Sequence, residues 1–135
     1  MFTSISSTSP GQVDSSETLT HYLFKGEYGN GHVKHRALQP PLGGVLSAFR
    51  VDGLMEGDIW DIASRHVETT SGRPIMARAD FDAGSVRMLG LEVIPAEPPV
   101  RHAHLTNWPD KAAIVSIAQQ LAASAMLRVR TPAGA

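Results

Sequence analysis

The strongest constraint on the fold is a change of apolar spacing within residues 100–126. "VRHAHLT", residues 100–106, alternates with period 2 and predicts a strand. Its two faces would carry Val100, His102, His104 and Thr106 on one side and Arg101, Ala103 and Leu105 on the other. "NWPDKAAIVSIAQQLAASAM", residues 107–126, then has helical spacing. Its apolar stripe comprises Ile114, Ile117, Ala118, Leu121 and Ala125. A strand followed by a helix with one apolar stripe predicts a helix that packs on a sheet.

The start of this helix carries its own signals. Asn107 or its neighbour can cap the helix, Pro109 suits its first turn, and Asp110 lies at the positive end of the helix dipole. Trp108 is expected to pack under the first turn and hold the entry of the chain. The alternative is an exposed anchor that binds a partner.

The rest of the chain alternates in the same way between short strands and helices. Strands are predicted over residues 18–24, 32–38, 45–51, 74–81 and 91–95, and helices over 52–68 and 82–90. Asn30-Gly31 predicts a tight turn and a hairpin formed by the first two strands. The residues after 126 leave a final strand open. The order predicts an α+β domain, with about three helices packed on a mixed, mostly antiparallel sheet.

A length of 135 residues corresponds to one domain. Residues 1–17 are rich in Ser and Thr, and we expect a flexible arm that buries little apolar surface. The folded domain should cover residues 18–130, and residues 131–135 should form a tail.

The composition excludes several classes of functional site and partner, but it assigns no activity. The net charge of −1 and the pI near 6.6 give no overall attraction to nucleic acid or to an anionic membrane, although a local basic patch stays open. The absence of cysteine excludes disulfides, thiolate metal sites and a cysteine nucleophile. No secretory signal and no membrane span is recognised, so we expect a cytoplasmic protein without a membrane partner. No phosphate-binding loop or dinucleotide motif occurs, so no cofactor is predicted.

The first candidate site is the pair His102 and His104. Residues two apart on a strand share a face, so both imidazoles could act in catalysis or bind one metal ion. A third ligand would have to come from Asp80, His66 or His35. We favour the simpler interpretation, in which one histidine packs and the other forms surface hydrogen bonds.

"HLT", His104 to Thr106, resembles half of the paired His-x-Thr motif of two-histidine phosphoesterases. That family needs a second His-x-Ser/Thr motif, and "HYLF", "HVKH" and "HVET" all lack the hydroxyl. The chain is therefore not expected to belong to it.

The second candidate site is "ARADFD". Arg78 and Asp80 share one side of a strand and could pair, and Arg78 with Arg101 could form a fork that binds an anion. The favoured interpretation is a structural ion pair, with Asp82 capping the following helix.

The third candidate site is "GNGHVKHR", with Arg50 further along the chain. Lys34 and Arg36 would project from one face of a hairpin, and His32 and His35 would add positive charge when they are protonated. Such a ribbon could bind phosphates or an anionic partner. The favoured interpretation is a solvated strand face.

The serines offer no recognisable nucleophile. None of them lies in a nucleophile elbow, which needs a strand, a sharp turn and a helix in sequence. Those considered are Ser47, Ser64, Ser85, Ser116 and Ser124.

The combination "LSAFR … IWDIA … ARADFD … RHAHLTNWPDK" resembles a small bacterial protein family with an RHA-x-L-x-x-WP-x-K motif, over about residues 19–127. The resemblance implies no activity, cofactor or site residue.

Two functional hypotheses follow from the residues. The favoured one is a small binding or adaptor module for a protein or nucleic-acid partner, with self-association left open. The alternative is a His-dependent hydrolase or phosphoesterase, with or without a metal, that uses His102 and His104 with support from Arg78, Asp80 and Arg101. Convergence of these five residues in one pocket would favour the enzyme, and their dispersal would favour the binding module.

Overall fold

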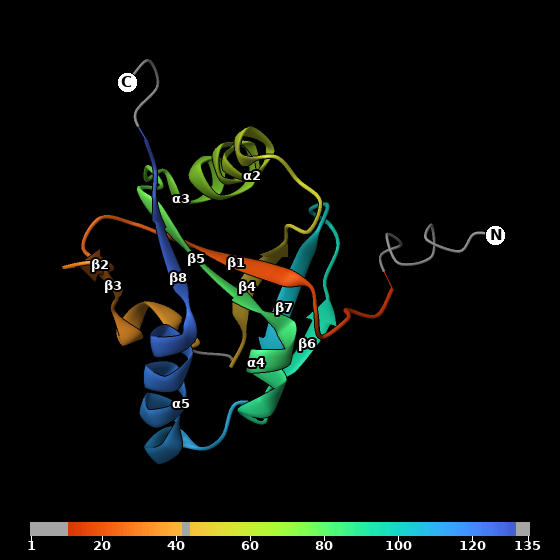
Figure 1. Ribbon diagram of the computed structural model, residues 1–135, viewed down its shortest axis with the longest axis vertical. Coiled ribbons are helices and arrows are strands. Elements are labelled where there is room, and N and C mark those ends of the chain that lie inside the picture. The colour runs from red at the N-terminus through yellow and green to blue at the C-terminus, as the bar shows by residue number, and fades with distance from the viewer. Residues whose placement is uncertain (1–10, 42–43, 132–135) are drawn as a thin grey trace.

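The computed structural model describes residues 11–41 and 44–131, and its centre is a six-stranded antiparallel sheet (Figure 1). The order across the sheet is β6-β7-β4-β1-β5-β8. The strands are β1 (Thr18–Leu23), β4 (Leu46–Arg50), β5 (Ala77–Asp82), β6 (Glu92–Pro95), β7 (His102–Thr106) and β8 (Met126–Val129). The predicted α+β fold is confirmed, and β8 settles the final strand that the sequence left open.

Helices connect strands that are not neighbours in the sheet. A continuous helical run comprises α2 (Glu56–Ile62), the π-helical segment η2 (Ala63–Glu68) and α3 (Thr69–Ser71), and it links β4 to β5. α4 (Ala83–Met88) links β5 to β6, and α5 (Lys111–Ser124) links β7 to β8. All strand pairings in the described sheet are antiparallel, since each helix returns the chain to a strand that is not adjacent to the one it left.

The face of the sheet that packs on α5, here called the α5 face, holds the larger core. Leu19, Phe81 and Leu105 lie on this face and are buried with Leu121 of α5 and Val86 of α4. Leu121 lies on the predicted apolar stripe and is fully buried, which confirms the helical phase expected from the sequence.

The opposite face, here called the α2 face, packs on the run from α2 to α3. Tyr22 and Phe49 on the sheet are buried with Ile59 and Ala63 of the helical run. The Tyr22 hydroxyl donates a hydrogen bond to the Ile59 carbonyl, so the helix is tied to the strand beneath it. In Figure 1, α2 and α3 lie on the side of the sheet opposite α5.

The segment between β1 and β4 differs from the prediction. β2 (Tyr28–Gly29) and β3 (His32–Val33) form a two-residue hairpin of their own, with positive φ at Asn30 and Gly31 as the turn requires. The strand predicted over 32–38 ends after Val33, and η1 (His35–Leu38) is a 3₁₀ helix. Helical turning places both Ala37 and Leu38 in the core, which an alternating strand could not do.

The N-terminal arm was predicted too long. Residues 1–10 lie outside the described residues, but Val13 is 1% exposed and belongs to the core. Glu17 pairs with the buried Arg50 through two hydrogen bonds, of 2.9 and 2.8 Å. Burial of Val13 and pairing of Glu17 fix this segment, which composition alone could not indicate.

The packing of α5 gives a first prediction. Leu121→Ala should lower the free energy of unfolding by roughly 2–5 kcal/mol, because it leaves a cavity under α5. Gln119→Ala is the matched control and should cost less than about 1 kcal/mol, because Gln119 is exposed on the same helix. Denaturant unfolding measures both, and equal costs would contradict the burial of the stripe.

A second prediction concerns residues 11–17. Deleting residues 1–17 should cost about 3 kcal/mol or more, because Arg50 loses its buried partner, and should lower Tm by roughly 10 °C. Glu17→Ala in the full chain should reproduce most of this loss. If the thermal midpoint does not move in either variant, the ion pair between Glu17 and Arg50 contributes nothing to the stability of the fold.

Candidate functional site

Two of the predicted histidines lie together on the α2 face, on β7. His102 and His104 are 4.8 Å apart between ring centroids. In the register of the sheet, His102 lies opposite Phe49 and His104 opposite Ser47. His66, from the π-helical segment η2, stacks on Phe49 at 6.3 Å and 16°. The shared face predicted for His102 and His104 is confirmed, and the tertiary structure adds His66 and Ser47 to the cluster.

The two ring nitrogens of His102 both have partners. Nδ1 lies 3.1 Å from the Ala96 carbonyl oxygen, and Nε2 lies 3.1 Å from the Ser47 Oγ. Because a carbonyl oxygen only accepts, the proton lies on Nδ1, and Nε2 accepts from the Ser47 hydroxyl. Burial lowers the pKa of His102, the Ala96 hydrogen bond opposes this, and the charges of His104 and His66 lower it further. The imidazole is therefore held neutral in a single tautomer.

The cluster is poorly suited to a metal ion. Within residues 11–41 and 44–131, no three His, Asp or Glu side chains gather closely enough to hold one. The Nε2 lone pair of His102 is already used by Ser47. Of the proposed third ligands, Asp80 is paired with Arg78 and His35 lies in η1.

The second candidate site is a buried ion-pair cluster. Arg78 is 2% exposed and donates to Asp80 at 3.0 Å and to both carboxylate oxygens of Glu56, at 3.1 and 2.7 Å. Its guanidinium carbon lies 4.7 Å from the ring centroid of Trp60. The expected pairing with Asp80 is confirmed. Because Glu56 takes the other guanidinium nitrogens, Arg78 is engaged within the fold and is not free to bind an anion.

Arg101 and Arg50 lie elsewhere. Arg101 has a φ of 70°, so the strand predicted from residue 100 begins only at His102. The Arg101 guanidinium donates hydrogen bonds to the Arg50 and Asp52 carbonyls. Arg50 is buried against Glu17. No anion-binding fork of Arg78 with Arg101 forms, because two other strands, β4 and β1, separate β7 from β5.

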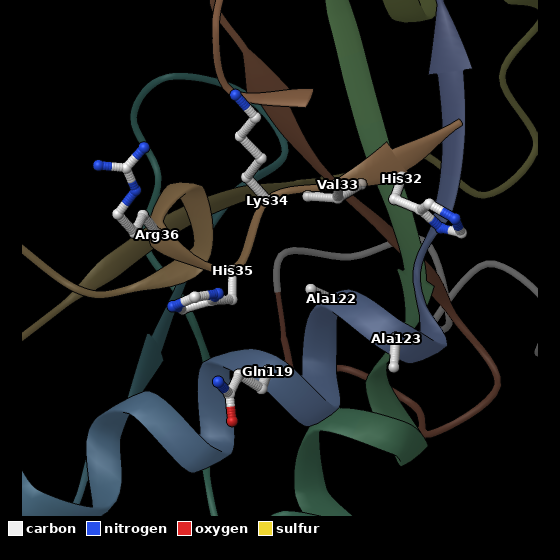
Figure 2. A pocket seen from close by; sticks show the side chains of 8 residues that line it. All are labelled: His32, Val33, Lys34, His35, Arg36, Gln119, Ala122 and Ala123. Atoms are coloured by element: carbon white, nitrogen blue, oxygen red, sulfur yellow. The ribbon is translucent and has the colours of Figure 1, made fainter. Parts of the chain in front are cut away.

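The third candidate site is a hollow of about 400 Å³ between the β3–η1 segment and the C-terminal half of α5 (Figure 2). Its lining residues are His32, Val33, Lys34, His35, Arg36, Gln119, Ala122 and Ala123. Figure 2 shows His35 pointing into the gap near Gln119, with Ala122 and Ala123 on the helix below. Lys34 and Arg36 rise from the other side of the segment, away from α5, so they form the rim of the hollow rather than its floor.

The charge of this hollow is of one sign. None of its lining residues is acidic, and all of them belong to the described part of the chain. The side chains of Lys34 and Arg36 are exposed and form no ion pair with any described residue. Both also line a smaller neighbouring hollow of about 160 Å³, where Glu27 is the one acidic lining residue. A cationic rim above small apolar side chains can bind an anionic group.

Trp108 occupies the position expected of a residue that holds the helix entry. It is half-buried against the larger core, and its Nε1 donates to the Leu105 carbonyl at 2.9 Å. Asp110 is the N-cap residue of α5. Trp108 therefore has a structural partner for both its ring and its N–H, and it does not enter the hollow described above.

The five residues proposed for catalysis do not converge. They divide into the histidine pair, the Arg78–Asp80 cluster and an isolated Arg101. The sequence offered His66 as a possible neighbour of His102, but it missed Ser47, and it missed Gln119, Ala122 and Ala123 as the far wall of the hollow. No local signal marks them, because strand register and helix placement bring them to these sites.

No family model, curated protein or solved structure matches this chain. The resemblance to a bacterial family noted above stays a prediction. No helix in the described ranges is both long and apolar enough to cross a lipid bilayer.

The environment of His102 predicts a dependence of stability on pH. In the unfolded chain a histidine takes up a proton near pH 6.5, roughly, whereas the folded pKa of His102 is lowered. The unfolded state therefore binds more protons as the pH falls. The contribution of His102 to the free energy of unfolding is present above that pH and is lost as the pH falls towards the folded pKa. His102→Gln should reduce the loss of stability on acidification in denaturant titrations. An unchanged pH dependence would contradict a lowered pKa.

Proposed function

We propose that this protein is a small binding module that docks an acidic segment of a partner protein in the hollow beside β3 and η1. The observation that carries the proposal is the unpaired, exposed pair of cations, Lys34 and Arg36, at the rim of a hollow without acidic lining. Complementary charge draws such a segment to the hollow and sets its orientation.

The lining of the hollow favours a peptide over a nucleic acid. The wall formed by Val33, Ala122 and Ala123 suits small apolar side chains. Proteins that bind single-stranded nucleic acid generally stack bases on aromatic rings, and the only rings in this lining are the imidazoles of His32 and His35.

The proposal is tested with a fluorescent peptide of alternating glutamate and alanine, measured by polarisation at low salt. Lys34→Ala/Arg36→Ala should weaken binding about tenfold, as expected for two partly exposed charge contacts. Added salt should weaken the binding to the unmodified protein.

Arg65→Ala/Lys111→Ala is the control, because it removes the same charge from exposed positions away from the hollow. If both double variants weaken peptide binding equally, the loss comes from the change in net charge and not from the hollow, and the proposal is overturned. Tighter binding of a fluorescent oligothymidylate than of the peptide would replace the protein partner with nucleic acid. Absence of binding to both probes would overturn the site.

A further inference from the structure

The helical run leaves one end of the α2 face open. Phe49 is buried under it, but Ser47, two residues earlier on β4, is exposed. On the neighbouring strand His104 is half-buried, and Ile94 beyond it on β6 is 44% exposed. The Ser47 hydroxyl is therefore reachable by a small molecule, although its histidine partner is fixed within the fold.

Ser47 and His102 have the arrangement of an activated nucleophile. The hydroxyl donates to Nε2 at 3.1 Å, and Nδ1–H donates to the Ala96 carbonyl at 3.1 Å. A serine next to a neutral imidazole, with a third group that fixes the tautomer, is the geometry that makes a hydroxyl nucleophilic. Here a backbone carbonyl takes the place that a carboxylate holds in a triad, so Ala96 is a positioning residue.

We propose that Ser47 and His102 are the nucleophile and the general base of a site that hydrolyses small carboxylic esters. His104 lies opposite Ser47 in the strand register, and we assign it the role of hydrogen-bond donor to the oxyanion. The main chain of Ser47 is held from β1, where Nδ1 of His21 donates to the Ser47 carbonyl at 2.7 Å. Ser47 is thus held by two histidines, His102 through its hydroxyl and His21 through its carbonyl.

The reaction is balanced by these groups and water alone. The Ser47 oxygen forms a bond to the acyl carbon while its proton moves to Nε2 of His102. Collapse of the tetrahedral intermediate breaks the bond to the alcohol, which leaves with the proton from Nε2. Water then attacks the acyl group, gives one proton to Nε2, and releases the acid as that proton returns to Ser47.

The charges near the site favour a neutral ester over a phosphoester. Arg78 is held by Glu56 and Asp80, and Arg101 is held by backbone carbonyls, so neither is free to neutralise a phosphate. Ile94 offers an exposed apolar surface beside His104 for a short acyl chain.

The test uses a fluorophosphonate probe with the full chain, followed by peptide mass analysis, and p-nitrophenyl acetate as substrate. Ser47 should be the labelled residue, and Ser47→Ala should lose both labelling and ester hydrolysis. Ser116→Ala, on the exposed side of α5, should retain both. Labelling that persists in Ser47→Ala, or no labelling of the unmodified protein, would overturn the proposal.

A second measurement separates catalysis from a merely structural hydrogen bond. The rate of labelling should rise with pH as His102 loses its proton and should reach a plateau near neutral pH; His104 and His66 are the titratable groups that lower its pKa. Folded His102→Gln should lose the labelling, and a folded His102→Gln that is labelled normally would overturn the role of the base.

The absence of native cysteine provides a variant that does not depend on the folding of His102→Gln. In Ser47→Cys the new thiol is the only one, and the adjacent imidazole should lower its pKa below roughly 8.5. Its alkylation by iodoacetamide should therefore be faster at about neutral pH than that of Ser116→Cys. Equal rates would overturn the activation of this position.

Discussion

The buried guanidinium of Arg78 is the interaction on which the arrangement of the α2 face depends. It lies on β5, next to the edge strand β8, is 2% exposed, and binds Asp80 on its own strand and Glu56 at the start of α2. Desolvation alone would lower the pKa of Arg78, but the bonds to Glu56 and Asp80 raise it on balance. The bond to Glu56 favours the observed crossing of α2 over the sheet, because any other position would leave this buried charge with Asp80 as its one carboxylate partner.

That crossing divides the α2 face into a covered and an open part. Ile59 and Ala63 cover Tyr22 and Phe49, and the π-helical segment brings His66 over the ring of Phe49. The strands beyond, at Ser47 and His104, stay accessible. π-Helical segments are often found at functional sites, and here the segment places His66 on Phe49, whose ring also contacts His102, the hydrogen-bond partner of Ser47.

The two proposals belong to different parts of the molecule and to different chemistry. The hollow beside η1 depends on unpaired cations at its rim, so it acts through charge and is sensitive to salt. The Ser47–His102 pair depends on a neutral imidazole in a fixed tautomer, so it acts through proton transfer and is sensitive to pH. Neither site shares a residue with the other, and each can therefore be removed alone.

The sequence by itself determined the local elements. Period-2 alternation marked β7, helical spacing marked α5, and Asn30-Gly31 marked a tight turn, because these signals arise from neighbouring residues. It also established that Arg78 and Asp80 share a strand face and could pair. Its errors lay where tertiary burial overrides local pattern, as at η1 and at Val13.

Only the tertiary structure decided the sites. The pairing of β4 with β7 places Ser47 opposite His104, although 57 positions separate them in the numbering, from 47 to 104. The packing of α5 under η1 creates the hollow between Lys34 and Ala122. Strand register and helix placement are set by burial of the whole core rather than by the residues that meet in a site. A serine without a local motif therefore acquired a histidine partner that its own stretch of sequence could not reveal.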